Sequence, residues 1–173
     1  MTIKYIQKDL FKTSAPAILA HACNTHGIWG GGIALQFSKK FPSTERKYIN
    51  HCQSHTPSEL LGTTLLIKSE LNDPGNLAGK QPHVIACLFT SKGGGGDADS
   101  PQKIVENTER AIKDLENQLN DTMEDWLLDT KPTEGNWLIE LPKINAGIFR
   151  VPWDETEKVL KGSEKLDFTV YVV

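Results

Sequence analysis

The sequence has few cysteines, no long apolar run and no surplus of basic residues, and each shortage excludes a class of protein. The three cysteines, Cys23, Cys52 and Cys87, are odd in number, far apart and without a Cys-x-x-Cys pair. This usage predicts a reduced, intracellular protein. No apolar stretch approaches the ~20 residues that cross a bilayer, and Met1 to Leu10 lacks the apolar core of a signal peptide. We therefore expect a soluble protein of the cytoplasm, the nucleus or both, with no membrane partner.

Positive charge is scarce as well. The chain has 19 Lys and Arg against 22 Asp and Glu, a formal net charge of −3. Proteins that grip nucleic acid through its phosphates usually carry a basic surplus, so we expect no nucleic-acid partner. A small anion held by backbone N–H groups needs no such surplus. No segment of the sequence marks an oligomer interface, and we expect a monomer.

What the sequence does contain is an alternation of apolar strands and amphipathic helices. Its 173 residues, 38% of them hydrophobic, suit one domain with a full core. Helices are predicted over 33–41, 43–53 with Ser43 as N-cap, 101–119 and 153–161, and strands over 3–6, 17–22, 62–67, 84–89, 137–141 and 168–173. This order predicts an α/β fold with a mixed, largely parallel sheet covered by helices on both faces. The polar stretch 120–136 is interpreted as an insertion.

Three loops rich in small residues follow predicted strands, over 23–32, 90–100 and 144–152. In an open α/β sheet, ligands bind outside the C-terminal ends of the strands. Glycine lets the backbone approach a ligand closely, and successive N–H groups in such loops can cradle an anion. The loops therefore favour a diphosphate site, although glycines that only form turns are the simpler alternative.

Other phosphate and metal motifs do not fit. The stretch Gly75 to Lys80 is one residue short of a Walker loop and lacks its final Ser or Thr, and no Cys is followed six residues later by Arg. His51 and His55 are spaced to share a zinc ion on a helix, but no further ligands are evident. We expect no resident metal and no cofactor.

The motifs in these loops resemble those of the macrodomain family. Lys8-Asp9-Leu10-Phe11 is similar to its Gly-Asp-Ile/Leu element, His21-Ala22-Cys23-Asn24 with Trp29 to Ala34 to its Asn-Ala-Ala-Asn and Gly-Gly-Gly segment, and Ile144 to Phe149 to its phosphate loop. The order holds from Ile3 to Val173. The variant looks most like the fungal branch of ADP-ribose 1″-phosphate phosphatases, a branch tied to by-products of transfer-RNA splicing.

The resemblance implies a three-layer α/β/α sandwich that binds ADP-ribose or ADP-ribose 1″-phosphate as its small-molecule partner. Asp9 would accept a hydrogen bond from the adenine, and Phe149 would pack on the distal ribose. Turn formation by Asp9 and core packing by Phe149 are the alternatives. The implied ligand-binding residues are Lys8, Asp9, Leu10, Ala22, Cys23, Asn24, Trp29, Gly30, Gly31, Gly32, Ile33, Ala34, Asn145, Ala146, Gly147, Ile148, Phe149 and Arg150.

Three residues are nominated for catalysis. His21 replaces the first Asn of the family motif and would protonate the leaving oxygen, unless it is a buried core histidine. Asn24 would bind the distal ribose, or else stabilise its own loop. Asp97 would orient or deprotonate the attacking water, with Asp99 as its substitute. Arg150 would pair with the terminal phosphate or point into solvent.

The resemblance leaves three activities open. The first is metal-independent hydrolysis of ADP-ribose 1″-phosphate by direct attack of water. The second is removal of ADP-ribose from modified proteins or of acetate from O-acetyl-ADP-ribose. A related branch of the family removes ADP-ribose from proteins with a Lys and an Asp. The matching positions here hold Ser91 and Phe149, which argues against this lysine-dependent reaction. The third is a non-catalytic ADP-ribose reader.

Overall fold

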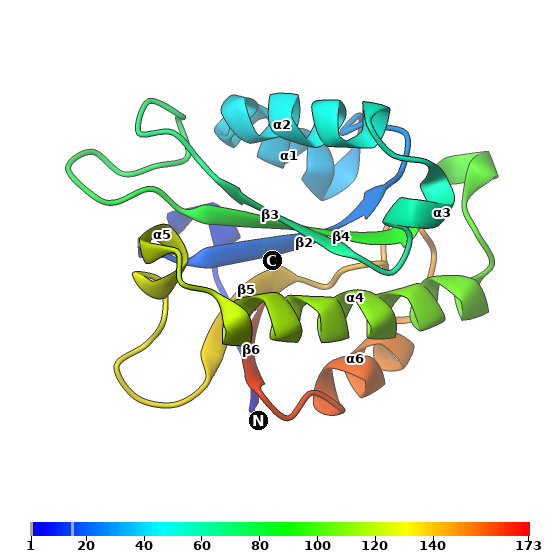
Figure 1. Ribbon diagram of the computed structural model, residues 1–173. Coiled ribbons are helices and arrows are strands. Elements are labelled where there is room, and N and C mark those ends of the chain that lie inside the picture. The colour runs from blue at the N-terminus through cyan, green and yellow to red at the C-terminus, as the bar shows by residue number, and fades with distance from the viewer. Residues whose placement is uncertain (1, 15) are drawn as a thin grey trace.

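The computed structural model describes residues 2–14 and 16–173. Its centre is a six-stranded sheet in the order β1-β6-β5-β2-β4-β3, visible edge-on in Figure 1. All neighbouring strands are parallel except β3 and β4. The mixed, largely parallel sheet is therefore confirmed. Its strands are β1 (Ile3–Gln7), β2 (Ile18–Asn24), β3 (Thr64–Lys68), β4 (Val84–Ser91), β5 (Trp137–Pro142) and β6 (Leu166–Val172).

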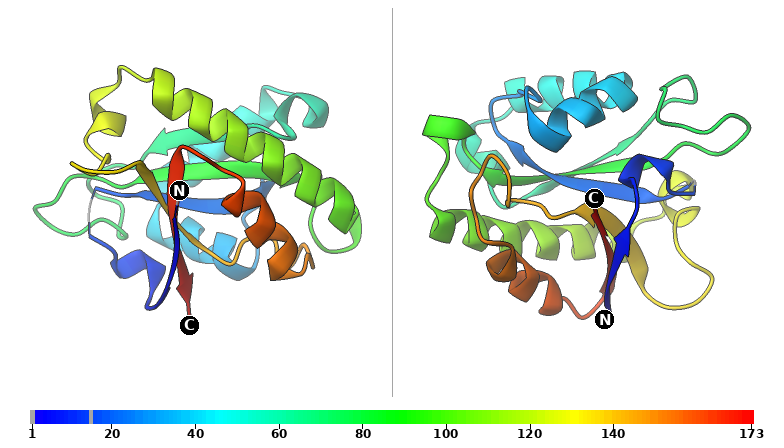
Figure 2. Two further views of the ribbon diagram at one scale, coloured as in Figure 1. Left: turned by 90° about the horizontal axis from the view of Figure 1, so that it is seen from below. Right: turned by 180° about the vertical axis from the view of Figure 1, so that it is seen from behind.

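Helices cover both faces of the sheet (Figures 1 and 2). On one face lie α1 (Gly32–Lys40) and α2 (Pro42–Gln53), and on the other α4 (Pro101–Asp121) and α6 (Trp153–Lys161). The three-layer arrangement is thus confirmed. Four shorter elements connect these layers: α3 (Pro57–Leu60), α5 (Asp125–Leu128) and the 3-10 turns η1 (Leu10–Lys12) and η2 (Gly95–Asp97).

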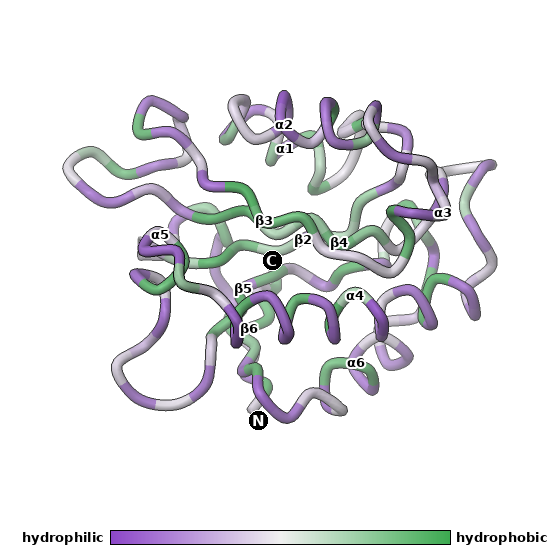
Figure 3. Tube along the Cα trace, in the orientation of Figure 1, coloured by the Kyte–Doolittle hydropathy of each residue, from purple (hydrophilic) through white to green (hydrophobic). Residues whose placement is uncertain are grey.

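The central strands explain why the core has two halves. All eight residues of β4 are buried, as expected for a strand with helices on both faces. Successive side chains point to opposite faces, so Ala86 and Leu88 join the cluster under α4, and Cys87 and Phe89 the cluster under α1 and α2. Figure 3 shows the hydrophobic sheet between helices with polar outer surfaces.

Two local expectations were wrong or incomplete. Ser43 is not the N-cap of α2, because the helix begins at Pro42 and Phe41 holds the cap position. Instead, the Ser43 N–H and hydroxyl both donate to the carboxylate of Asp73, the N–H over 3.1 Å. The Asp73 carboxylate, thirty residues away in the sequence, thus accepts a first-turn N–H of α2 that a local N-cap side chain would otherwise bind. The expected insertion contains a helical turn, α5, as well as irregular chain.

Within the described ranges, no helix is both long and apolar enough to cross a membrane.

Candidate functional site

A cavity of about 500 Å³ opens where β2, β4 and β5 end. This size suits a small-molecule ligand, and the position is the one expected of an α/β sheet. Three chain segments form it: the end of β2 with the start of α1, the loop after β4, and the loop after β5. Its lining comprises residues 22–24, His26, 28–34, Gly94, Asp97, 142–145 and 147–149.

The first segment brings an uncapped helix end to the cavity. Helix α1 starts at Gly32, and its cap residue Gly31 offers no side chain to the first-turn N–H groups. Gly32 has a φ of +58°, a left-handed conformation that glycine adopts without a Cβ penalty. Because the first N–H groups of a helix have no partner within it, they form a site for an anion.

The loop after β5 closes the cavity from the other side. Its Ile148 approaches both other segments: a Cβ at Gly31 would lie 3.2 Å from Ile148 Cδ1, and one at Gly94 would lie 3.3 Å from Ile148 Cγ2. Ile148 itself is half exposed. The small residues at 31 and 94 therefore leave room for an apolar bridge across the cavity mouth.

Asn145 lines the cavity, but its side chain serves the fold. Its backbone has a φ of +65°, a region in which Asn is enriched. The carboxamide oxygen accepts from the Thr90 hydroxyl at 2.9 Å, and Nδ2 donates to Thr108 Oγ1 at 3.0 Å and Thr156 Oγ1 at 3.4 Å. The side chain thereby joins β4, α4 and α6 behind the cavity wall.

Asn24 stabilises its own loop and, within the part of the chain that the structure describes, has one N–H without an acceptor. Its Oδ1 accepts from the His26 N–H at 2.9 Å and the Tyr48 hydroxyl at 3.0 Å, while Nδ2 donates to the Ile28 carbonyl at 2.7 Å. An amide nitrogen carries two hydrogens, and among the described residues Nδ2 donates to the Ile28 carbonyl alone, so its second N–H is available to a molecule in the cavity.

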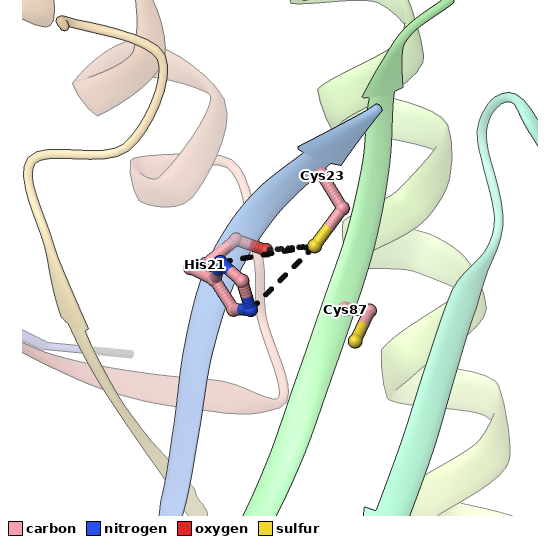
Figure 4. Close-up of side chains that lie close together, drawn as sticks. All are labelled: His21, Cys23 and Cys87. Atoms are coloured by element: carbon pink, nitrogen blue, oxygen red, sulfur yellow. Dashed lines mark hydrogen bonds between the residues drawn. The ribbon is translucent and has the colours of Figure 1, made fainter. Parts of the chain in front are cut away.

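A buried group of His21, Cys23 and Cys87 lies where β2 and β4 adjoin (Figure 4). Cys23 Sγ is 3.8 Å and 3.6 Å from the two imidazole nitrogens of His21, and the His21 ring stacks on Phe37 with centroids 4.0 Å apart. Burial would raise the pKa of the Cys23 thiol, but a hydrogen bond from Cys87 and the neighbouring imidazole lower it overall. Burial and the proximity of Cys23 raise the pKa of Cys87.

One His and two Cys are also ligand types for zinc or copper(I). Their ligand atoms lie within 4.8 Å of one another, and among the described residues this is a three-ligand group without a fourth member. The expectation of no resident metal stays a prediction.

The structure brings most of the nominated residues together. Those that line the cavity are Ala22, Cys23, Asn24, Trp29, Gly30, Gly31, Gly32, Ile33, Ala34, Asp97, Asn145, Gly147, Ile148 and Phe149. Lys8, Asp9, Leu10, His21, Ala146 and Arg150 are outside its lining. The Asp9 carboxylate accepts from the Phe11 N–H at 3.0 Å as the cap of η1. His21 has no exposed surface, so this geometry does not support it as a proton donor to a molecule in the cavity.

The sequence reasoning missed several lining residues, chiefly His26, Ile28, Gly94 and residues 142–144. All of these positions had a usable signal. His26, Ile28 and Gly94 lie within the predicted glycine-rich loops, and residues 142–144 lie at the end of a buried strand, where ligand contacts concentrate.

Comparison with known proteins identifies the family that this chain resembles. The family model described as "Macro domain" matches residues 20–160. A protein of Meyerozyma guilliermondii named ADP-ribose 1''-phosphate phosphatase is 48% identical over 99% of this chain and 98% of its own length. Proteins with that name from Candida albicans and Saccharomyces cerevisiae are 44% and 37% identical, with at least 97% of each chain covered.

Solved structures share the fold at low sequence identity. The macrodomain of Mycobacterium tuberculosis DarG has a TM-score of 0.70 and 18% identity, covering 99% of this chain and 98% of its own. Thermosipho africanus DarTG in complex with ADP-ribose has a TM-score of 0.72 and 16% identity, covering 99% of this chain and 42% of its own.

Proposed function

Because this chain belongs to the macro domain family, we propose that it binds ADP-ribose 1″-phosphate in the cavity and hydrolyses it to ADP-ribose and phosphate. The observation that carries the proposal is the 48% identity, along nearly the full length of both chains, to a protein named for this activity. The chain acts as a single domain and a monomer in this proposal.

The cavity offers what such a substrate needs. The uncapped first turn of α1 supplies N–H donors and a partial positive charge for the diphosphate. Phe149 and Ile148 supply apolar surface for a ribose, and the free N–H of Asn24 supplies a polar contact. Backbone donors dominate this set, which agrees with a chain of net charge −3.

Hydrolysis proceeds by direct attack of water on phosphorus. Uncatalysed phosphate-monoester hydrolysis is extremely slow, so positioning and electrostatic stabilisation must supply most of the acceleration. Asp97 lines the cavity and is exposed to it, so its carboxylate is available to orient the water and accept its proton.

The test is release of inorganic phosphate from ADP-ribose 1″-phosphate by the purified protein with EDTA present, alongside calorimetric titration with ADP-ribose. We expect turnover and binding. Binding without release would favour a reader or a hydrolase of ADP-ribosylated proteins. Absence of both would contradict the proposal.

A further inference from the structure

His26 is an exposed imidazole that lines the cavity and has no role in the mechanism above. Among the described residues, the cavity lining has four titratable side chains: Cys23, His26, Asp97 and Lys143. Of these, Cys23 is 2% exposed and directed toward His21 and Cys87. His26 and Lys143 are therefore the two exposed groups that could give a proton to a bound ligand.

The loop that bears His26 is fixed to the loop after β4. The Thr25 N–H and hydroxyl both donate to the carbonyl of Lys92, at 3.0 Å and 2.8 Å. The His26 N–H donates to Asn24 Oδ1 at 2.9 Å, and the Tyr48 hydroxyl donates to the same oxygen at 3.0 Å. The backbone of Thr25 and His26 is thus fixed relative to the loop after β4.

Asp97 approaches the same place from that neighbouring loop. A Cβ at Gly93 would lie 2.8 Å from Asp97 Cβ and 3.2 Å from His26 Nε2. Real Cβ atoms essentially never come as close as the first of these distances. Glycine at 93 therefore leaves room for the His26 imidazole and the Asp97 side chain to lie near each other.

A carboxylate and an imidazole on the same cavity wall can serve the two sides of a reacting phosphate, one accepting a proton from the attacking water and the other giving a proton to the leaving oxygen. Resting on the proposed phosphatase function, we propose that His26 is the general acid of the reaction, with Asp97 as its partner base. The oxygen of water forms a bond to phosphorus while the bond from phosphorus to the ribose O1″ breaks. The electron pair goes to O1″, which takes the proton from His26 Nε2, and Asp97 takes a proton from the water. Solvent exchange then returns both groups to their starting states.

His26 fits this role better than His21. The His21 ring has no exposed surface and packs against Phe37 and Trp29, so it cannot contact a ligand without rearrangement of the core. The reaction needs a donor whose nitrogen reaches the cavity.

The test compares His26→Gln, Asp97→Asn and the double variant with His55→Gln as the matched control. His55 is another exposed histidine, but it lies beyond the end of α2 and outside the cavity lining. We expect His26→Gln to lower kcat about 100-fold or more while leaving ADP-ribose affinity within about threefold. Asp97→Asn should also lower kcat, and it should leave ADP-ribose affinity nearly unchanged.

A second readout distinguishes the loss of a proton donor from misfolding of the variant. His26→Ala leaves a space at an exposed position, and added imidazole should restore part of its turnover while doing nothing for His55→Gln. Full activity in His26→Gln, or a loss explained entirely by weaker ADP-ribose binding, would overturn the role of His26 and leave the proposed function intact. Absence of phosphate release by the wild-type protein would instead overturn the proposed function, and this inference with it.

Discussion

Gly93 is the residue whose small size most directly shapes the candidate site. A methyl group there would collide with Asp97 Cβ at 2.8 Å and crowd the Asp97 carbonyl at 3.1 Å. Because the nearest atoms belong to a Cβ and to backbone, η2 would have to move.

We therefore predict that Gly93→Ala lowers kcat about tenfold or more while the midpoint of urea unfolding changes little. Gly96→Ala is the matched control, because its added Cβ would meet nothing within 4 Å in the same loop. Steady-state kinetics of both variants check this, and equal activity of the two would show that the position of Asp97 is unimportant.

His83 predicts how stability depends on pH. It is fully buried, its Nδ1 accepts the Ala17 N–H at 3.1 Å, and its Nε2 has no partner among the described residues. Burial, the largest cause, lowers the pKa of His83 from its ordinary value of 6.5. The folded protein thus prefers the neutral ring, and the unfolded chain takes up its proton first.

The stabilisation should be present above pH 6.5 and be lost as the pH falls below it, by at most about 1.4 kcal/mol per pH unit. His83→Asn retains an acceptor near the Nδ1 position and removes the titration. We expect its free energy of unfolding to fall less than that of wild type between pH 7.5 and 5.5. The exposed His55→Asn serves as control, and parallel pH profiles for His83→Asn and wild type would contradict the assignment.

At the scale of the elements, the Asn145 carboxamide fixes the loop after β5 to its neighbours. It bonds to hydroxyls on β4, α4 and α6. We predict that Asn145→Ala lowers the free energy of unfolding by about 2–4 kcal/mol, from lost buried hydrogen bonds and from strain at a φ of +65°.

Asn145→Gly separates the two causes, because glycine relieves the backbone strain but cannot form the side-chain hydrogen bonds. It should be about 1 kcal/mol more stable than the alanine variant. Urea unfolding of the three proteins measures both differences. Wild-type stability in the alanine variant would show that the junction contributes nothing.

The same elements show what a sequence can reveal. Strands such as β4 were predictable, because a continuous apolar run between loops is typical of a central strand that helices cover on both faces. Their ends then located the cavity. The cap of α2 was not predictable, because Ser43 bonds to Asp73 through tertiary structure rather than by local spacing. The nearness of His26 to Asp97 was not predictable for a related reason, because it arises only when two loops meet at Gly93.

At the scale of the whole molecule, the candidate site depends on the central strands of the sheet. The cavity is lined by segments that follow β2, β4 and β5, so unfolding of the sheet must separate the three walls. A ligand that contacts all three binds the folded state alone, and mass action then ties stability to ligand concentration.

We therefore predict that ADP-ribose at 100 times its Kd stabilises the protein by about 2.7 kcal/mol, and by roughly 1.4 kcal/mol more for each further tenfold increase. For a chain of this size the first figure corresponds to a rise in Tm of roughly 5–11 °C. Differential scanning fluorimetry over a ligand series measures it. Adenosine and ribose 5-phosphate, each able to reach only part of the three walls, should raise Tm less at equal concentration. A rise in Tm with adenosine as large as that with ADP-ribose would mean that the glycine-rich loops do not bind the diphosphate.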